Sequence, residues 1–416
     1  MADPIPTLHT YAAGKVNRAA ITDWVVEQFR FYLPIIGIFI LSRALFYLII
    51  VGTRSMLPFL SNTDSIQQAH GYLLAAHYRW DAVHYADLAV NGYPVVYDDI
   101  RGFRLAFFPL LPLCMNLIAR LTGSASELAV LLGGIVLGHL FALVAFVLLF
   151  TVTLDDTGDV ALARRTVLYT ALSPLAVFYS VPYTEPLFLA LSLGFFLAAR
   201  RRRWLLAGLL IGLATASRLA GLALVPALLV EFWLVYRSRT LHPGETVRAA
   251  CGLLLAPAGL VAFMSYLWWH TGDPLAFAHA QVHWHRDTLF PLVTLWRGIT
   301  YALHPAWSVN PQFYIQGVVS TCIVILFLAV LLVSARRWRC SYVVFGVLIM
   351  ILALLSPLKG GQTMQSTGRY VMVLFPVMIT LASWLRTPRM QNLTLILSSV
   401  LFMVISALYA HWFLVI

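Results

Sequence analysis

The stretch HYRWDAVHYADLAVNGYPVVYDD, residues 77–99, gathers side chains that could carry acid–base chemistry. If RWDAVHYADLA is helical, Asp81, His84 and Tyr85 share one face, because residues three and four positions apart are neighbours on a helix. The turn sequence NGYP at 91–94 then ends the helix. A carboxylate, an imidazole and a phenol would point the same way. The alternative is a solvated amphipathic helix whose aromatic rings lie at a membrane interface.

Three further charged residues interrupt apolar sequence. Arg218 lies in GLATASRLAGLALVP, Arg369 in STGRYVMVLFP and Glu185 in PYTEPLF. A charge in such surroundings needs a partner, although an arginine near a helix end can also extend its side chain to the interface. Arginine binds phosphate through two parallel hydrogen bonds and stays charged. Two arginines and a few acids on one face therefore suit an anionic headgroup next to an acidic catalyst.

The segment WHTGDPLAFAHAQVHWHRD, residues 269–287, contains four histidines and two tryptophans. His283 and His285 have an HxH spacing, but alternate residues on a helix point apart and the sequence marks no third ligand. We therefore predict no metal site here. Aromatic rings with polar edges are more typical of sugar subsites or of the membrane interface.

The elements that position these residues are predicted to be membrane helices. The 416-residue chain is 61% hydrophobic and 11% charged, whereas soluble domains are about 25% charged. Apolar runs of about 20 residues, the length that crosses the hydrocarbon core, recur along the chain. The composition predicts an all-α polytopic membrane protein with a single domain over residues 1–416.

The net charge of +11 comes mostly from arginines in short runs between apolar segments. This is the positive-inside pattern of membrane topology, and it argues against nucleic acid as a partner. With the N-terminus inside, it predicts about eleven spans and two large outer loops, 53–105 and 269–312. Pro109 and Pro112 make segment 105–121 a re-entrant or interfacial segment. The expected spans are about 33–52, 128–152, 165–181, 184–199, 204–217, 221–236, 248–268, 313–334, 340–356, 370–385 and 391–413.

Six segments in this order resemble the PIG-V-like mannosyltransferase family, which includes GPI mannosyltransferase II and belongs to the GT-C glycosyltransferase superfamily. They are RWDAVHYADLAVNGY, AFFPLLPL, ALSPLAVFYSVPYTEPLFL, AGLLIGLATASRLAGLALVP, GDPLAFAHAQVHWHR and MQSTGRYVMVLFP, and they cover about residues 75–385. The resemblance implies a GT-C-like helical bundle with short amphipathic helices in the first outer loop. It also implies inverting transfer of mannose from a polyprenyl- or dolichyl-phosphate mannose donor to a glycolipid or glycan acceptor on the non-cytoplasmic face.

The resemblance implies that the acid of the first outer loop, here Asp81, is the catalytic carboxylate. We expect Arg218, Arg369, His84 and Lys359 to bind the donor phosphate. We expect the sugar or the acceptor to contact Trp80, Tyr85, Tyr183, Glu185, Trp284 and Arg286. A strict DxD motif is missing, and Asp87 and the pair Asp98–Asp99 are poor substitutes. We therefore expect no metal and no cofactor, with a divalent cation left open.

Other functions remain open at this stage. A GT-C enzyme for another lipid-phosphate sugar fits the same composition. A transporter or lipid flippase also needs charges inside the membrane, but the sequence shows no internal repeat of the kind that such proteins often have. A non-catalytic relative is opposed by the intact RWD motif. The compact length favours a prokaryotic member in the cell membrane; a eukaryotic one would lie in the endoplasmic reticulum membrane.

Overall fold

The computed structural model describes residues 18–57, 70–95, 101–240, 242–304, 311–359 and 364–413. Nearly all of these residues that have regular structure are helical, and the one β-type pairing within these ranges is an isolated bridge between Arg286 and Leu358. The longer helices are α2 (Arg18–Thr53), α6 (Leu110–Leu121), α7 (Glu127–Thr157), α8 (Val160–Ala171), α9 (Glu185–Arg200), α10 (Trp204–Ser217), α11 (Leu224–Arg237), α12 (Pro243–Leu255), α13 (Ala258–Thr271), α15 (Pro291–Leu303), α16 (Pro311–Ser334), α17 (Cys340–Leu355), α19 (Phe375–Trp384) and α20 (Pro388–Ala410).

Short elements connect them. These are α4 (Tyr72–Ala75), α5 (Asp81–Asn91), η1 (Gly102–Ala106), η2 (Ala176–Tyr179), η3 (Leu219–Ala223), α14 (Ala276–His279), η4 (Ala280–Trp284) and α18 (Thr367–Val371). The expected helix over RWDAVHYADLA is confirmed as α5, and Gly92, with a φ of 70°, follows its last residue. A positive φ is readily adopted by glycine, which is why the NGYP sequence ends the helix there.

Six helical segments are long and apolar enough to cross a membrane: Phe29–Thr53, Glu127–Thr157, Leu219–Arg237, Gly244–Thr271, Tyr314–Ser334 and Pro388–Ala410. Four shorter apolar helices accompany them: Leu110–Leu121, Trp204–Ser217, Cys340–Leu355 and Phe375–Trp384. Many leucine and valine side chains on these helices are exposed in the isolated chain. Because water would not tolerate so much exposed apolar surface, these findings confirm the all-α membrane protein predicted from composition.

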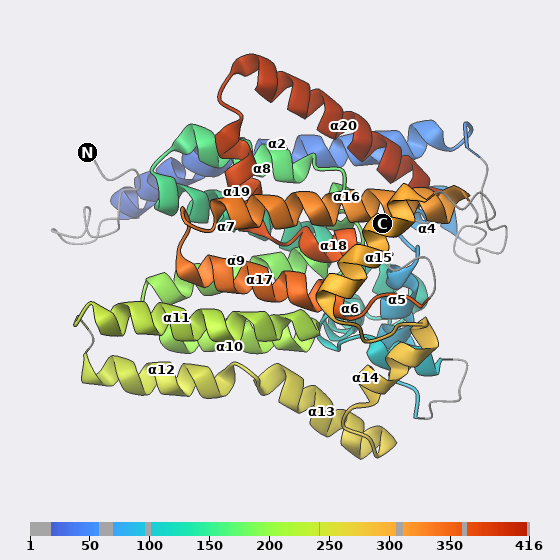
Figure 1. Cartoon of the computed structure of the whole chain (residues 1–416), viewed down its shortest axis with the longest axis horizontal. Coiled ribbons are helices and arrows are strands. Elements are labelled where there is room, and N and C mark those ends of the chain that lie inside the picture. The colour runs from blue at the N-terminus through green and yellow to red at the C-terminus, as the bar shows by residue number, and fades with distance from the viewer. Residues whose placement is uncertain are drawn as a thin grey trace.

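The long helices lie side by side, and short elements gather at one end of the bundle. In Figure 1, α5, α14 and α15 lie at the right-hand end. The α11–α12 and α16–α17 connections, which carry Arg237, Arg239 and Arg336–Arg339, turn at the left-hand end. The arginine runs and the RWD segment are thus separated by the length of the bundle.

Segment 105–121 contains α6, which has 12 residues and therefore rises about 18 Å, well short of a hydrocarbon core of about 30 Å. Pro109 precedes the helix and Pro112 lies in its first turn, where a missing backbone N–H breaks no intrahelical bond. The two prolines therefore set where the helix starts instead of breaking it. The short length agrees with a segment that does not cross the membrane by itself.

Two expected spans are divided by proline. Segment 248–268 contains α12 and α13, which meet at Pro257, the residue that precedes the first turn of α13. Segment 165–181 contains the end of α8 and then η2, with Pro174 between them. In both places a proline cannot donate the backbone hydrogen bond that would continue the helix. The span expected at 248–268 lies within Gly244–Thr271, which is long and apolar enough to cross a membrane although its helix is interrupted.

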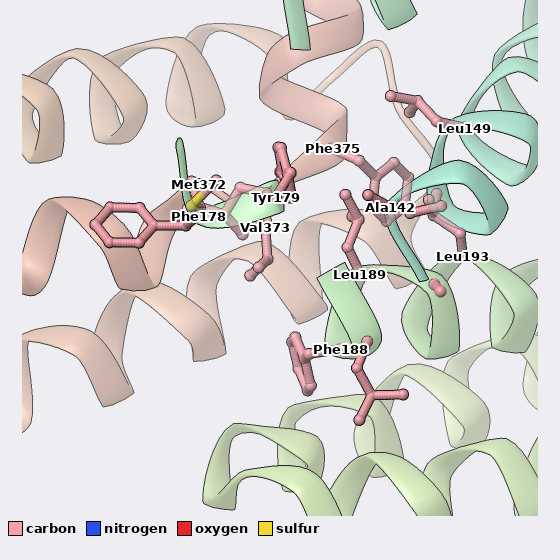
Figure 2. Packing of buried hydrophobic residues seen from close by; sticks show 14 of the residues in the cluster. Ala142, Leu149, Phe178, Tyr179, Phe188, Leu189, Leu193, Met372, Val373 and Phe375 are labelled. Carbon is pink, nitrogen blue, oxygen red and sulfur yellow. The ribbon is translucent and has the colours of Figure 1, made fainter. Parts of the chain in front are cut away.

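The core lies around η2, α7 and α9. Figure 2 shows Phe178 and Tyr179 of η2, Phe188 and Leu189 of α9, and Phe375 at the start of α19, and all five are buried. This packing fixes the backbone on both sides of Glu185 and just after Arg369. Charged residues placed here are therefore held by a rigid apolar framework.

Candidate active site

Asp81 is the first residue of α5, and the backbone that leads to it is unusual. Trp80 precedes the helix with φ 51° and ψ −121°, a region that residues other than glycine seldom adopt. Such strain persists only where the surroundings enforce it. The N–H of Asp81 donates a hydrogen bond to the Tyr183 hydroxyl over 3.2 Å.

The surroundings that enforce this backbone come largely from the end of α20. Tyr409 and Tyr183 both donate hydrogen bonds from their hydroxyls to the Arg79 carbonyl, over 3.2 and 3.3 Å. Arg79 Nε donates to the Ala410 carbonyl over 3.1 Å, and its guanidinium lies 4.9 Å from the centre of the Trp412 ring. Residues that are 330 or more positions away from Arg79 in the sequence therefore help to fix the backbone before Asp81. Sequence reasoning missed Arg79 and Tyr409, because no local pattern links them.

A chain of ion pairs extends from Asp81. Its Oδ2 lies 2.7 Å from Nη2 of Arg369, and Nε of Arg369 lies 3.2 Å from Oε1 of Glu185. The same Glu185 oxygen lies 3.2 Å from Nη1 of Arg218. The Asp81 side chain is 23% exposed and that of Glu185 is 2% exposed. Asp81 is thus accessible to a substrate, while Glu185 lies behind the two arginines.

Both carboxylates occupy the first residue of a helix. Asp81 begins α5 and Glu185 begins α9, where Pro186 follows it in the first turn. Free backbone N–H groups and the helix dipole favour negative charge at this end. Arg218 lies between α10 and η3 in extended conformation, and Arg369 lies within α18. Four separate elements therefore converge on the ion pairs.

The buried charge of Arg369 is maintained by its partners. Burial alone would lower the pKa of the Arg369 guanidinium, but the carboxylates of Asp81 and Glu185 outweigh it and raise that pKa well above its ordinary value. Oε2 of Glu185 has no hydrogen-bond partner among the described residues. Glu185 thus makes both of its ion pairs through one oxygen.

Tyr370 adds a second centre that sequence reasoning missed. The guanidinium carbons of Arg218, Arg369 and Arg286 lie 5.2, 5.3 and 5.7 Å from the centre of its ring. Arg286 donates hydrogen bonds to the Tyr370 hydroxyl over 3.2 Å and to the Ser356 carbonyl over 2.6 Å. Burial raises the pKa of Tyr370, but the arginines outweigh it and lower the pKa below its ordinary value. Three cations therefore surround one phenol beside Asp81.

Comparison with known proteins gives this geometry a family. Residues 32–265, more than half of the chain, match the family model described as Mannosyltransferase (PIG-V). The chain belongs to that family. The match contains Asp81, Glu185 and Arg218 and ends before Arg286 and Arg369.

Curated relatives carry names that agree with this family. GPI alpha-1,6-mannosyltransferase 2 of Cricetulus griseus is 35% identical over 182 residues, which are 41% of this chain and 35% of the relative. GPI mannosyltransferase 2 of Cryptococcus neoformans is 30% identical over 198 residues, which are 45% of this chain and 44% of the relative. The matched part thus spans less than half the length of these relatives.

Solved structures show a partial similarity. ArnT from Cupriavidus metallidurans, in a structure bound to undecaprenyl phosphate, superposes with a TM-score of 0.48 at 17% identity, over 87% of this chain and 62% of ArnT. The Archaeoglobus fulgidus oligosaccharyltransferase, tethered with an acceptor peptide, gives a TM-score of 0.48 at 13% identity, over 94% of this chain and 56% of that protein.

In this PIG-V family chain, the imidazole of His84 is neutral at pH 7. It lies among the rings of Phe103, Phe107 and Trp284. Burial lowers the pKa of His84 to about 4, although Asp81 raises it in part. Arg104 Nε donates to His84 Nδ1 over 3.5 Å, which assigns the remaining proton to Nε2. His84 can therefore meet an anion as a neutral hydrogen-bond donor but not as a cation.

The other expected residues surround the PIG-V family site at different distances. Trp284 contacts the His84 ring and donates to the Phe103 carbonyl over 2.9 Å. The Tyr85 hydroxyl lies 3.4 Å from that of Thr184, and Trp80 packs against Trp412. Lys359 is exposed, and its backbone N–H donates to the His285 carbonyl over 2.7 Å. Lys359 makes no ion pair within the described ranges.

Asp87, one of the carboxylates considered in place of a DxD motif, is held by two arginines. Asp87 pairs with Arg101 over 2.6 Å and with Arg104 over 2.8 Å. The pair Asp98–Asp99 lies outside the described residues. Within the described ranges, no three His, Cys, Asp or Glu side chains are grouped so that they could hold a metal ion.

Proposed function

We propose that this PIG-V family chain is a membrane-embedded inverting mannosyltransferase acting as one domain. It moves mannose from a polyprenyl- or dolichyl-phosphate mannose to a hydroxyl of a glycolipid or glycan. The observation that carries the proposal is the 2.7 Å pair between Asp81 and Arg369. This pair places a partly exposed carboxylate beside a cluster of guanidinium groups in a highly apolar helical protein, and the family match agrees with it.

Asp81 acts as the general base. It takes the proton from the acceptor hydroxyl while that oxygen forms a bond to the anomeric carbon of mannose. The bond from that carbon to the phosphate oxygen breaks, and its electron pair leaves with the phosphate. Attack opposite the phosphate converts a β-mannosyl phosphate into an α-mannoside. A positioned base contributes about 10²–10⁴-fold to the rate, and phosphate needs no acid to leave.

Arginine side chains stabilise the phosphate. Arg218 and Arg369 stay charged and can hydrogen-bond two phosphate oxygens at once. His84, as a neutral donor, and Lys359 assist at the edge. The aromatic wall of His84 and Trp284 supports the sugar, with Trp80, Tyr85, Tyr183, Glu185 and Arg286 completing the surroundings of sugar and acceptor.

The reaction takes place on the outer or lumenal face and needs no metal ion. The arginine-bearing connections lie at the end of the bundle opposite α5 and α15 (Figure 1), which supports this orientation because basic loops stay on the cytoplasmic side. The lipid tail of the donor lies in the bilayer beside the helices. A GT-C-like arrangement of helices fits this access from the membrane.

A transfer assay tests the proposal. Purified protein in lipid nanodiscs is incubated with dolichyl- or undecaprenyl-phosphate mannose and a panel of glycolipid acceptors, and products are identified by mass. Parallel reactions use lipid phosphates of arabinose, galactose and an amino sugar. Transfer of mannose that is lost in Asp81→Asn supports the proposal. Transfer only of another sugar would correct the donor, and lipid-phosphate flux across vesicles without any transfer would favour a flippase.

A further inference from the structure

The cluster of charges around Tyr370 contains one more cation than anion. Three guanidinium groups, of Arg218, Arg286 and Arg369, lie around Tyr370, and two carboxylates, of Asp81 and Glu185, lie among them. Glu185 pairs with Arg218 and Arg369, and Asp81 pairs with Arg369.

The unmatched cation is Arg286. Its side chain donates hydrogen bonds to neutral oxygens, the Ser356 carbonyl and the Tyr370 hydroxyl. No carboxylate of the described chain segments lies within ion-pair distance of it. A half-buried guanidinium without a carboxylate is a ready binding group for an anion, because binding one removes the cost of an uncompensated charge.

We propose that Arg286 receives the donor phosphate first, and that Arg369 passes from Asp81 to the phosphate as Asp81 takes up the acceptor proton. This inference rests on the proposed function. It states which anion each arginine pairs with before and during the transfer. Arg218 remains paired with Glu185 through Nη1 throughout, while its other N–H groups contact the phosphate.

The charges of site and substrate then match at both stages. Before transfer, three cations and two carboxylates leave one positive charge, which equals the single negative charge of the phosphodiester. During transfer the acceptor O–H bond breaks and its proton moves to Asp81, while the leaving phosphate gains a negative charge. Afterwards three cations face one carboxylate, and the lipid phosphate carries close to two negative charges above its second pKa of about 6.

The other titratable groups near Asp81 do not supply this change. They are His84 and Tyr85 on its own helix, Tyr183 and Glu185 at the start of α9, Tyr370 beside Arg369, and Tyr409 on α20. Burial lowers the pKa of His84 to about 4, which keeps it neutral. Glu185 is already shared by two guanidinium groups. Asp81 is the one of these groups that is both partly exposed and bound to a single arginine.

Tyr370 is a positioning residue in this scheme. Its hydroxyl accepts the hydrogen bond that directs Arg286, and its ring keeps three like charges apart at 5.2–5.7 Å from its centre. Tyr370→Phe keeps the ring and removes the acceptor. We expect this variant to weaken phosphate binding less than Arg286→Gln does.

Binding of a lipid phosphate tests the scheme without requiring turnover. Farnesyl phosphate is titrated at pH 8 into the full chain in nanodiscs, using the wild type, Asp81→Asn, Arg286→Gln and the double variant Asp81→Asn with Arg369→Gln. Arg297→Gln, on the exposed face of α15, is the matched control. Asp81→Asn imitates the protonated carboxylate, so we expect it to bind about tenfold more tightly than the wild type.

The remaining expectations complete the test. Arg286→Gln binds about tenfold more weakly, the double variant loses the gain of Asp81→Asn, and Arg297→Gln binds like the wild type. If Asp81→Asn binds farnesyl phosphate as weakly as the wild type, or more weakly, the proposal that Arg369 leaves Asp81 to pair with the phosphate is wrong. Unchanged binding by Arg286→Gln overturns its role as first contact. Asp81→Ala, which removes the same charge, replaces Asp81→Asn if that variant does not fold.

Failure of this scheme and failure of the proposed function give different results. If the wild type transfers mannose but neutral substitutions at Asp81 do not tighten farnesyl phosphate binding, the scheme is wrong and the function stands. If no sugar is transferred but neutral substitutions at Asp81 still tighten farnesyl phosphate binding, the proposed reaction is wrong. The competition between Asp81 and the phosphate for Arg369 then stands.

Discussion

Arg369 lies between two carboxylates, with one nitrogen 2.7 Å from Asp81 and another 3.2 Å from Glu185. The two acids differ in access, because Asp81 is 23% exposed and Glu185 is 2% exposed. One guanidinium thus links a partly exposed acid to a buried one. We therefore expect removal of the Asp81 charge to affect turnover and removal of the Glu185 charge to affect stability.

Asp81→Asn should abolish transfer while the protein inserts and still binds the donor, because the amide cannot accept the acceptor proton. We expect kcat to fall by at least about 10²-fold, measured with lipid-phosphate mannose in nanodiscs. Asp287→Asn is the matched control, since Asp287 is an exposed carboxylate in segment 269–312. Wild-type turnover by Asp81→Asn would remove this residue from the chemistry.

Glu185→Gln should act mainly on stability. It leaves the buried guanidinium of Arg369 with one carboxylate and that of Arg218 with none among the described residues. Breaking a buried ion pair from one side typically costs about 3–5 kcal/mol. Thermal unfolding in detergent should therefore show a large fall in Tm. Glu127→Gln, which alters one exposed hydrogen bond with Tyr78, should change the Tm much less, and similar shifts in both would contradict this role.

The effects on kcat of removing the two tyrosine hydroxyls that donate to the Arg79 carbonyl, those of Tyr183 and Tyr409, should not be independent. Tyr183→Phe or Tyr409→Phe alone leaves the other hydroxyl in place, at a cost of about 1 kcal/mol. The double variant leaves the carbonyl before Asp81 without either hydroxyl and should lower kcat by more than the product of the single effects. Steady-state kinetics of the three variants measure this coupling. Strictly multiplicative effects would show that the two hydroxyls act separately.

His84 should make the fold sensitive to mild acid. Burial lowers the pKa of His84 to about 4 from an ordinary value of 6.5. Between these values the unfolded chain takes up a proton and the folded chain does not, so stability is lost as the pH falls from 6.5 toward 4. His84→Gln has no such proton. Tm measured across this range should fall less steeply for His84→Gln than for the wild type, and parallel curves would argue against a neutral, buried His84.

Local pattern was enough to predict α5 and the shared face of Asp81 and His84, because helical spacing depends on neighbours in sequence. Apolar runs likewise predicted the membrane helices, but not the breaks near Pro174 and Pro257, where one missing N–H matters more than hydropathy. Arg218 and Arg369 were singled out because a charge in apolar sequence needs a partner.

What that reasoning could not supply was the identity of the partners. Glu185 was singled out as a charge that needs a partner, and its two partners, Arg218 and Arg369, lie in distant segments. Tyr370 was not singled out, because two of its three cationic neighbours, Arg218 and Arg286, come from distant segments. Arg79 contacts Ala410, and no periodicity spans such a separation.

The clamp made by Tyr409, Ala410 and Trp412 on the RWD segment has a consequence for biogenesis. The RWD segment is synthesised well before the residues that fix its backbone, because Arg79 and Tyr409 are 330 positions apart in the sequence. The backbone before Asp81 can therefore reach this conformation only after α20 has been made and has packed against it.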